Sequence, residues 1–299
     1  MSIASNNLCR TDRLNNLRAL TVLILLMLGG LLLSVVITSI SAFIPLFNEI
    51  SIIRCSITLQ NLLAFIAPAI LMPVIVYGKS AGKFSVGNAP HPSALIWFIL
   101  IYATATPAIN YATYINEALT LPESLSSLEQ WMRASEESAK AVTDKLMANS
   151  SLGNLFANIL YIGIITGIGE ELFFRGALQN VFVGLFRNKH VAVWIGAVVF
   201  SAFHLQFYGF IPRMLMGALF GYARLWTGSF WVPATIHAIN NSTVVVLNYL
   251  AEKGIADDSY STIGAESGFP ILAIASIIMT IILLTTFHLN TEHKQKLWH

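Results

Sequence analysis

Long apolar segments, separated by shorter polar ones, dominate the chain. Eight of them approach the roughly 20 mostly apolar residues that a membrane-spanning helix needs, near residues 19–46, 59–78, 94–112, 153–175, 191–209, 211–226, 231–250 and 269–289. The sixth segment is short. Prolines inside the second and third segments predict kinks, at Pro68, Pro73 and Pro107. The pattern predicts an all-α, polytopic membrane bundle of about eight transmembrane helices.

One sizeable polar segment, residues 121–150, lies between the third and fourth apolar segments. Its apolar positions recur at helical spacing, at Leu125, Leu128, Trp131 and Met132. This spacing in a polar segment is typical of an amphipathic helix. We expect that helix to lie outside the bilayer.

The composition points to the same class of protein. Of the 299 residues, 56% are hydrophobic and 11% are charged, and the mean hydropathy is +0.69. Soluble domains carry roughly a quarter charged residues, so a polytopic membrane protein is indicated. The two cysteines, Cys9 and Cys55, provide neither a disulfide framework nor metal-ligand spacing.

The basic residues predict the orientation in the membrane. The apolar run at residues 19–47 is far longer than the roughly 7–15 residues of a signal peptide's apolar core, so we expect a retained first helix. With the N-terminus inside, ten basic residues fall on the inner side and six on the outer side, whereas two acidic residues fall inside and eleven outside. Because loops on the cytoplasmic side are enriched in Lys and Arg, N-in and C-in is predicted. This orientation places Glu170 toward the inner end of the fourth helix.

Ionisable groups inside three of the apolar segments indicate a functional site. A charged side chain near the bilayer centre costs roughly 2.5–3.5 kcal/mol on insertion scales, and such groups face a bundle interior or a cavity. The fourth segment contains GIGEELFFRG (167–176), with Glu170, Glu171 and Arg175. The fifth contains His204, and the seventh contains His237, Asn240 and Asn241.

Helical spacing assigns partners within these segments. Glu171 and Arg175 are four residues apart, so they share a face and can pair. Glu170 is displaced by about 100° around the helix and is left to face a cavity. Together with His204, and with His237 and Asn241 on one face of the seventh segment, it can reach a common centre. The segment edges, however, place His204 deeper in the membrane than Glu170.

Such a centre supports hydrolysis. A carboxylate and an imidazole can take the proton of an attacking water, and a second imidazole with a carboxamide can donate hydrogen bonds to the oxyanion that forms. The alternative for the charged groups is a buried ion pair that only joins helices, and Asn240 and Asn241 can serve as interhelical hydrogen-bonding groups. The glycines beside the glutamates leave room for close helix approach or for a substrate backbone. The Met214, Met216 and Phe220 stripe is expected to be ordinary packing.

Three motifs in this order resemble a known family. EELFFR (170–175) has the form EExxxR, FSAFH (200–204) the form FxxxH, and HAINN (237–241) contains HxxxN. The set resembles the CPBP or Abi family of type II CAAX prenyl endopeptidases and bacteriocin-processing proteins, which are intramembrane proteases. The resemblance covers about residues 151–250, which we expect to be the catalytic core. Residues 1–150 would supply three helices and the external segment, and residues 251–299 the last helix and a cytoplasmic tail.

The resemblance implies roles for individual residues. Glu170 and His204 would activate the attacking water, His237 and Asn241 would hold the oxyanion, and Glu171 and Arg175 would support the site. A Zn²⁺ held by Glu170, His204 and His237 is the competing mechanism, since two imidazoles and a carboxylate are a legitimate zinc set. The metal-free mechanism is favoured, because the HExxH spacing of zinc proteases is absent and Asn241 is a poor zinc ligand.

The resemblance also implies a setting. The expected location is a cell membrane, the bacterial inner membrane, with the active site toward the cytoplasmic side. The expected partners are membrane lipid and a peptide or lipidated-protein substrate, with no nucleic acid. A non-catalytic family member that acts in bacteriocin immunity or as a scaffold is the alternative from a different class. An ion-coupled transporter is disfavoured, because inverted repeats are absent.

Overall fold

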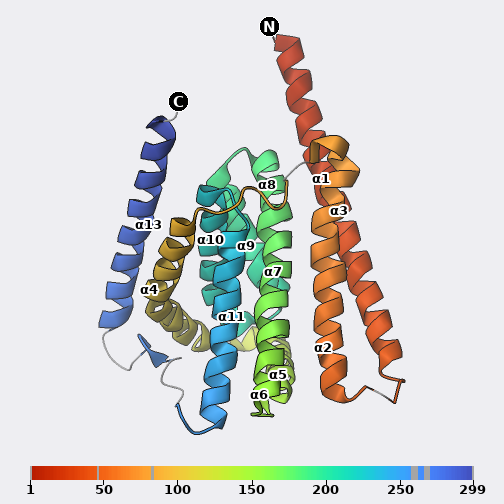
Figure 1. Ribbon diagram of the computed structural model, residues 1–299, viewed down its shortest axis with the longest axis vertical. Coiled ribbons are helices and arrows are strands. Elements are labelled where there is room, and N and C mark those ends of the chain that lie inside the picture. The colour runs from red at the N-terminus through yellow and green to blue at the C-terminus, as the bar shows by residue number, and fades with distance from the viewer. Residues whose placement is uncertain (1, 46, 82–83, 257–261, 266–269, 298–299) are drawn as a thin grey trace.

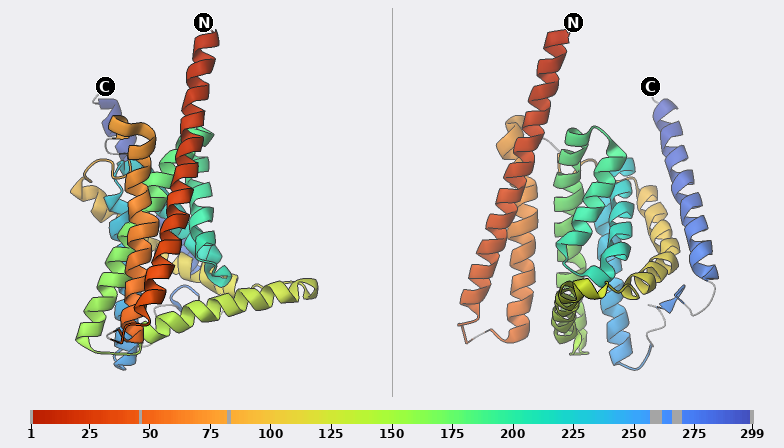
Figure 2. Two further views of the ribbon diagram at one scale, coloured as in Figure 1. Left: turned by 90° about the vertical axis from the view of Figure 1, so that its right-hand side faces the viewer. Right: turned by 180° about the vertical axis from the view of Figure 1, so that it is seen from behind.

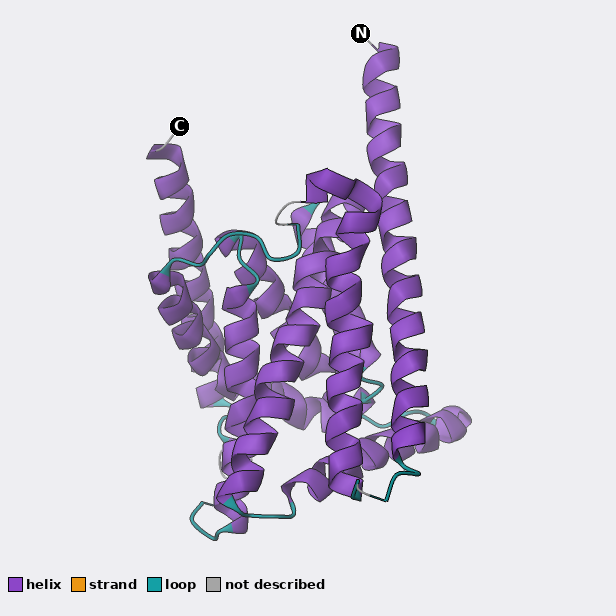
Figure 3. Ribbon diagram, turned by 45° about the vertical axis from the view of Figure 1, so that its right-hand side comes forward, coloured by secondary structure: helices purple, strands orange, loops and turns teal. Residues whose placement is uncertain are grey.

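The computed structural model describes residues 2–45, 47–81, 84–256, 262–265 and 270–297 as an all-α bundle (Figure 1, Figure 3). Within these residues the only β contact is an isolated bridge between Gly87 and Ser229. The predicted all-α class is therefore confirmed. The polypeptide avoids strands because helices satisfy every backbone hydrogen bond within one segment, as an apolar environment demands.

Most helices of the bundle are long and run side by side (Figure 1). The second and fourth long helices each contain π-helical turns: α2, η1 and α3 form one, and α6, η4, α7, η5 and α8 form the other. The bounds in chain order are α1 Ser2–Ser41, α2 Glu49–Gln60, η1 Asn61–Ile66, α3 Ala67–Tyr77, η2 Gly78–Ala81, α4 Pro92–Glu117, η3 Glu123–Leu125, α5 Ser126–Met147, α6 Leu152–Asn158, η4 Ile159–Ile165, α7 Thr166–Glu171, η5 Leu172–Leu178, α8 Gln179–Phe186, α9 Lys189–Phe203, η6 Phe207–Gly209, α10 Phe210–Thr227, α11 Trp231–Glu252 and α13 Ile271–Leu297.

The protein is a multi-pass membrane protein. Among the described residues, five helical stretches are long and apolar enough to cross a membrane: Arg13–Ser41, Glu49–Tyr77, Pro92–Glu117, Leu152–Phe186 and Ile271–Thr291. The helix α9 is apolar but shorter. Helices α10 and α11 lie where the sixth and seventh segments were expected, yet their arginines, histidine and asparagines lower their hydropathy. The number of eight spans stays a prediction.

The helix α5 lies across one end of the bundle, almost at a right angle to the long helices, and both termini lie at the other end (Figure 2). The predicted amphipathic helix is thus present and lies outside the bundle. Its apolar residues Leu128 and Trp131 remain 45% and 50% exposed, whereas Leu146 is buried at 2%. Only part of its apolar face therefore packs on the protein.

The depth of the candidate residues differs from the prediction. The fourth span continues beyond residue 175 to Phe186, so Glu170 lies near its middle and not at its inner end. At 1.5 Å per residue, Glu170 is about 24 Å from Phe186 along the axis. The following helix, α9, returns over 15 residues to His204, which is about 22 Å. Glu170 and His204 therefore lie at nearly the same depth, and the expected mismatch disappears.

The position of His204 also bears on access to the site. It caps the C-terminal end of α9, and the turn that follows faces the end of the bundle where α5 lies (Figure 2). With the N-terminus inside, that end is the outer one. The helix bounds place Glu170 near the middle of its span, and the expected access from the cytoplasmic side stays a prediction.

The predicted orientation rests in part on residues outside the described part of the chain. Lys83, Asp257 and Asp258 lie outside the described residues. The side chains of Arg10, Asp12, Lys79, Glu292, Lys294 and Lys296 also lie outside the described part of the chain. The N-in and C-in orientation stays a prediction.

The expected kinks coincide with irregular helix geometry. The π-helical turn η1 directly precedes Pro68 at the start of α3, and Pro73 lies inside α3. Pro107 lies inside α4, which bends visibly (Figure 1). Because proline lacks a backbone N–H and clashes with the preceding turn, these sites are where a helix departs from regular geometry.

Candidate active site

Three predicted site residues meet in the centre of the bundle. The Nε2 atoms of His204 and His237 each lie 3.9 Å from Oε2 of Glu170. Glu170 comes from α7, His204 from the end of α9, and His237 from α11. Glu170 and His237 are only 9% and 5% exposed. The tertiary structure therefore brings together two imidazoles and a carboxylate that lie up to 67 positions apart in the chain.

Close contact between α7 and α11 produces this arrangement. A Cβ atom at Gly167 would lie 2.9 Å from the backbone nitrogen of Ala238, the residue after His237. The two backbones thus touch at a point where only glycine fits. This contact brings the glutamates of α7 within reach of His237. Gly167 therefore permits the close approach of the two helices, as one of the two expected roles of these glycines.

The second glutamate, Glu171, joins two partners through one oxygen. Its Oε1 accepts a hydrogen bond from Nη1 of Arg175 at 2.6 Å and lies 2.9 Å from Nδ1 of His237. Arg175 also donates from Nη2 to the carbonyl of Gly217 at 3.0 Å. Glu171 is fully buried and Arg175 is 2% exposed. The predicted pairing of Glu171 with Arg175 is present, and the bond to His237 is a contact that helical spacing did not predict.

Aromatic rings surround the charged groups. Phe200 is the first residue of FSAFH. Its ring centroid lies 4.3 Å from the guanidinium carbon of Arg175 and 5.0 Å from the ring centroid of His204. Phe220 stacks on His237 with ring centroids 5.1 Å apart and an interplanar angle of 25°. Phe220 is buried in the hydrophobic core, as expected, and it also covers one face of a site imidazole. Such rings exclude water while their faces attract cations.

The hydrogen bonds of both imidazoles leave the same nitrogen facing Glu170. Nδ1 of His204 lies 2.9 Å from the carbonyl oxygen of Phe200, which only accepts, so Nδ1 carries the proton. Nδ1 of His237 is held in the same way by Glu171. In the neutral rings both Nε2 atoms are then acceptors, and Oε2 of Glu170 is buried without a hydrogen bond to the protein. Three acceptors converge, which is the setting for a shared proton donor such as water.

The fourth predicted residue, Asn241, has other hydrogen-bond partners. Its Nδ2 donates to the carbonyl of Ile162 at 3.1 Å, and its Oδ1 accepts from Asn240 at 3.0 Å. Asn240 in turn accepts from the hydroxyl of Tyr102 at 3.1 Å. This chain of bonds links α4, α11 and η4. The expectation of interhelical hydrogen bonds is confirmed for Asn240 and Asn241, and the oxyanion role of Asn241 stays a prediction.

A polar residue from the second span also contacts the site segment. Asn61, 3% exposed, donates from Nδ2 to Oγ1 of Thr166 at 3.3 Å and to the carbonyl of Ile57 at 2.9 Å. A Cβ at Gly169 would lie 2.4 Å from Oδ1 of Asn61. Sequence reasoning missed this residue. The available signal was an asparagine inside an apolar segment, where polar groups are costly and have partners.

The three converging side chains, two imidazoles and one carboxylate, are of the types that bind zinc. Zinc-ligating imidazoles usually donate their other N–H to a carboxylate or a carbonyl, as both Nδ1 atoms do here. Ligands at about 2 Å from one tetrahedral ion lie roughly 3.3 Å apart, whereas both separations from Glu170 are 3.9 Å. Among the described residues, no group of three or more His, Cys, Asp or Glu has metal-site geometry. Glu170, His204 and His237 would hold the ion, which would supply Lewis-acid activation of a water.

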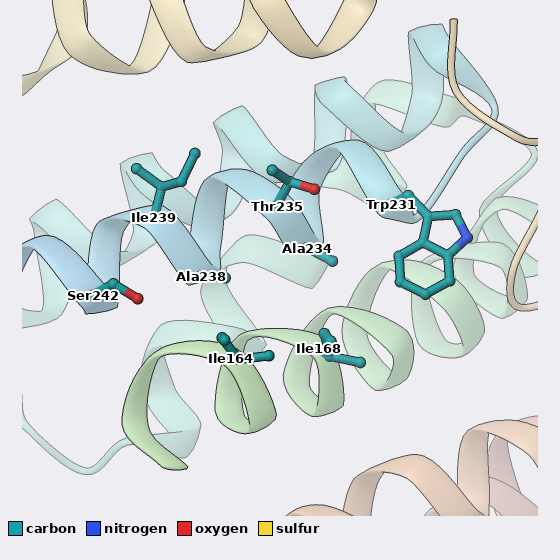
Figure 4. Close-up of a pocket in the computed structure, with 8 residues that line it drawn as sticks. All are labelled: Ile164, Ile168, Trp231, Ala234, Thr235, Ala238, Ile239 and Ser242. Carbon is teal, nitrogen blue, oxygen red and sulfur yellow. The ribbon is translucent and has the colours of Figure 1, made fainter. Parts of the chain in front are cut away.

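An apolar groove of about 340 Å³ lies between α11 and the long helix that contains η4 and α7. Figure 4 shows Ile164 and Ile168 facing α11 across it, with Trp231 at one end. The α11 wall consists of small and apolar side chains with two hydroxyl groups, from Ala234, Thr235, Ala238, Ile239 and Ser242. Its two walls belong to the helices that carry the glutamates and His237.

Comparison with known proteins agrees with the motifs. Residues 152–243 match the family described as type II CAAX prenyl endopeptidase Rce1-like. The chain is similar to the uncharacterized protein YpbD of Bacillus subtilis, at 29% identity over 86 residues, which are 27% of this chain and 41% of that protein. It is also similar to an uncharacterized 24.3 kDa protein of Escherichia coli, at 29% identity over 107 residues, which are 33% of this chain and 48% of that protein. No solved structure matches significantly.

The resemblance to type II CAAX prenyl endopeptidases is therefore confirmed over residues 152–243. The matched region contains all three motifs and every predicted site residue. In both relatives the similarity spans less than half of the protein. The family match supports a peptide hydrolase of the CAAX-type intramembrane protease kind.

Proposed function

We propose that the protein is an intramembrane endopeptidase that hydrolyses a peptide bond by means of a water activated by Glu170 and His204. The observation that carries the proposal is the convergence of Glu170 Oε2 with the Nε2 atoms of His204 and His237, each at 3.9 Å. A water between Glu170 and His204 donates one proton to Oε2 and one to Nε2 and keeps its lone pairs for attack. The buried surroundings strengthen these electrostatic contacts.

The reaction has two proton transfers. Glu170 and His204 take the proton of the water as its oxygen attacks the carbonyl carbon, and a tetrahedral oxyanion forms. The same groups return a proton to the leaving amine when the C–N bond breaks. No covalent intermediate with the protein is involved, so one water is consumed for each bond cleaved.

The oxyanion is stabilised by His237 and Asn241 in this proposal. Donation from Nε2 of His237 requires a second proton on the ring, because Nδ1 already carries one toward Glu171. Glu171 then accepts the hydrogen bond from Nδ1 of the imidazolium. Asn241 retains one N–H beyond the bond to Ile162. Each such donor is worth about 10²–10³-fold in rate.

The substrate class follows from the position of the site. The site lies among membrane-spanning helices, two of which also line an apolar groove of about 340 Å³. A peptide that carries a lipid or an apolar leader segment reaches this site from the bilayer, whereas a soluble peptide does not. We propose a prenylated, lipidated or leader-type peptide as the substrate and a bacterial cell membrane as the location.

A zinc-dependent form of the same protease is the second candidate. The observation that favours it is that both site imidazoles have Nδ1 engaged and Nε2 facing one carboxylate, as ligating imidazoles do. Metal analysis of active enzyme decides between the two. The metal-free mechanism predicts full activity after dialysis against a chelator and no stoichiometric metal. Loss of activity that Zn²⁺ restores would establish the second candidate.

The test of the proposed function is cleavage in reconstituted membranes. Peptides released from membranes of cells that express the wild-type protein are compared with those from cells that express Glu170→Gln, and a candidate substrate is then supplied to purified protein in liposomes. Glu170→Gln and His204→Ala are expected to abolish cleavage and leave insertion intact. Matched controls are Glu137→Gln and His190→Ala at exposed positions, which keep activity. Full cleavage by both site variants would refute the proposal, and a phenotype that persists in them would support the non-catalytic alternative.

A further inference from the structure

The turn that follows His204 has an unfavourable backbone conformation. Leu205 has a φ of 52°, in the left-handed region that a residue with a Cβ rarely adopts. Such a conformation persists only where the surrounding structure holds it, and it is typical of functional sites. The next residues run through η6 into the start of α10. The groups that hold this turn therefore determine where the imidazole of His204 lies.

Asn116 in the last turns of α4 spans the turn. Its Nδ2 donates to the carbonyl of Phe207 at 2.9 Å, and its Oδ1 accepts from the backbone N–H of Ile211 at 2.7 Å. Because a carbonyl only accepts and an amide N–H only donates, both bonds are satisfied in a single orientation of the carboxamide. Ile211 lies in the first turn of α10, where backbone N–H groups have no partner within the helix. Asn116 is 3% exposed.

Helix α5 holds the same turn from a second direction. Oγ of Ser135 donates to the carbonyl of Leu205 at 2.9 Å. The side chain of Gln206 donates to Glu136 at 3.3 Å and accepts from Nη2 of Arg213 at 2.8 Å. Arg213 also donates to the carbonyl of Gln206 at 2.9 Å. The backbone carbonyls of residues 205, 206 and 207 thus accept hydrogen bonds from side chains of α5, α10 and α4, respectively.

We propose that Asn116 is a positioning residue for His204 and that Ser135 and Glu136 of α5 assist it. This inference rests on the proposed function, since it concerns the water-activating imidazole. Asn116, Ser135 and Glu136 all lie outside residues 152–243, the region that matches the family. The N-terminal part of the chain therefore completes an active site whose reacting groups come from the matched region.

The expected consequence is kinetic. Nε2 of His204 lies 3.9 Å from Oε2 of Glu170, and misplacement of a catalytic group by about 1 Å can cost roughly 10²-fold in rate. Asn116→Ala removes the hydrogen bonds to Phe207 and Ile211 that hold the turn. We therefore expect kcat to fall about 10–100-fold while KM stays within about twofold. Ser135→Ala removes one bond at the surface and is expected to lower kcat less. Neither variant removes a group that touches substrate.

The experiment measures two quantities on the full-length protein in liposomes. Hydrogen exchange, followed by mass spectrometry, reports the protection of residues 204–211, and cleavage of the substrate found for the wild type reports kcat and KM. The matched control is Asn110→Ala, also on α4, whose side chain donates to the carbonyl of Ile263 at 3.1 Å and not to the turn.

The outcomes are distinct. Faster exchange confined to residues 204–211 together with a lower kcat and an unchanged KM supports the proposal. If Glu170→Gln and His204→Ala are inactive but Asn116→Ala and Ser135→Ala keep the kcat of Asn110→Ala, the positioning role is refuted and the protease function stands. If the two site variants keep full activity, the protease function fails, and exchange at residues 204–211 still shows whether Asn116 holds the turn. Should Asn116→Ala fail to fold, Ser135→Ala and Glu136→Gln provide the same comparison, and wild-type kcat in both would refute the positioning role.

Discussion

The Nδ1 atom of His237 lies 2.9 Å from Oε1 of Glu171, the same oxygen that accepts a hydrogen bond from Arg175. One carboxylate thus holds a site imidazole and neutralises the buried guanidinium. Glu170, the adjacent residue, faces the other side of that imidazole, since its Oε2 lies 3.9 Å from Nε2. The two neighbouring glutamates therefore contact opposite nitrogens of one ring.

This arrangement predicts different outcomes for stability and activity. Arg175→Met leaves a fully buried carboxylate without its cation, and we expect a loss of about 3–5 kcal/mol in the free energy of unfolding. The double variant Glu171→Leu with Arg175→Met removes both charges and should recover much of that stability. The double variant should not recover cleavage, because Glu171→Leu removes the carboxylate that orients His237.

Thermal unfolding in detergent and cleavage in liposomes test this prediction on the same preparations. The control is Lys140→Met, which breaks an exposed pair with Asp144 on α5 and should change stability by less than about 1 kcal/mol. An active double variant would show that Glu171 does not orient His237.

The contact between Gly169 and Asn61 predicts a suppressor. In Gly169→Ala the new Cβ lies 2.4 Å from Oδ1 of Asn61, and such overpacking costs typically about 1–3 kcal/mol. Asn61→Ala removes that oxygen and leaves only its own Cβ at 3.3 Å. We expect Gly169→Ala to lower stability and activity in the wild type and to be nearly neutral in the Asn61→Ala background. Equal effects in both backgrounds, measured by thermal unfolding, would contradict the contact.

The close approach of α7 and α11 predicts that Gly167→Ala is harmful and that no change of a facing side chain relieves it. In Gly167→Ala the new Cβ lies 2.9 Å from the backbone nitrogen of Ala238 and 3.1 Å from its Cα. Because backbone atoms cannot rotate away, the helices must separate and move Glu170 from His237. Cleavage is expected to fall about tenfold or more. Gly196→Ala on α9 is the control, since its Cβ meets nothing within 4 Å, and it should leave cleavage unchanged.

The apolar groove predicts a change in substrate affinity. Thr235→Phe places a ring in the groove between α7 and α11, so KM for a lipid-bearing substrate should rise about tenfold while kcat changes little. Val244→Phe on the same helix, at a position 47% exposed, is the matched control. Unchanged KM for the lipid-bearing substrate would exclude the groove as its binding site.

The sequence predicted the local part of the structure. Apolar runs indicated the helices because a membrane leaves the backbone few alternatives. A spacing of four residues paired Glu171 with Arg175, because such neighbours share a helical face. The three motifs indicated the site residues, and two of the predicted imidazoles do meet Glu170.

Only the tertiary structure decided the depth of the site and the partners of its residues. The hydropathy windows ended the fourth helix at residue 175 because polar groups interrupt its apolar pattern, although the helix continues to Phe186. Asn61 and Asn116 contact segments that lie about 90–105 positions further along the chain. Such contacts depend on how helices pack, and π-helical turns shift the face that each side chain presents. Periodicity within one helix carries no information about either, so the sequence identified the groups and their packing determined the site.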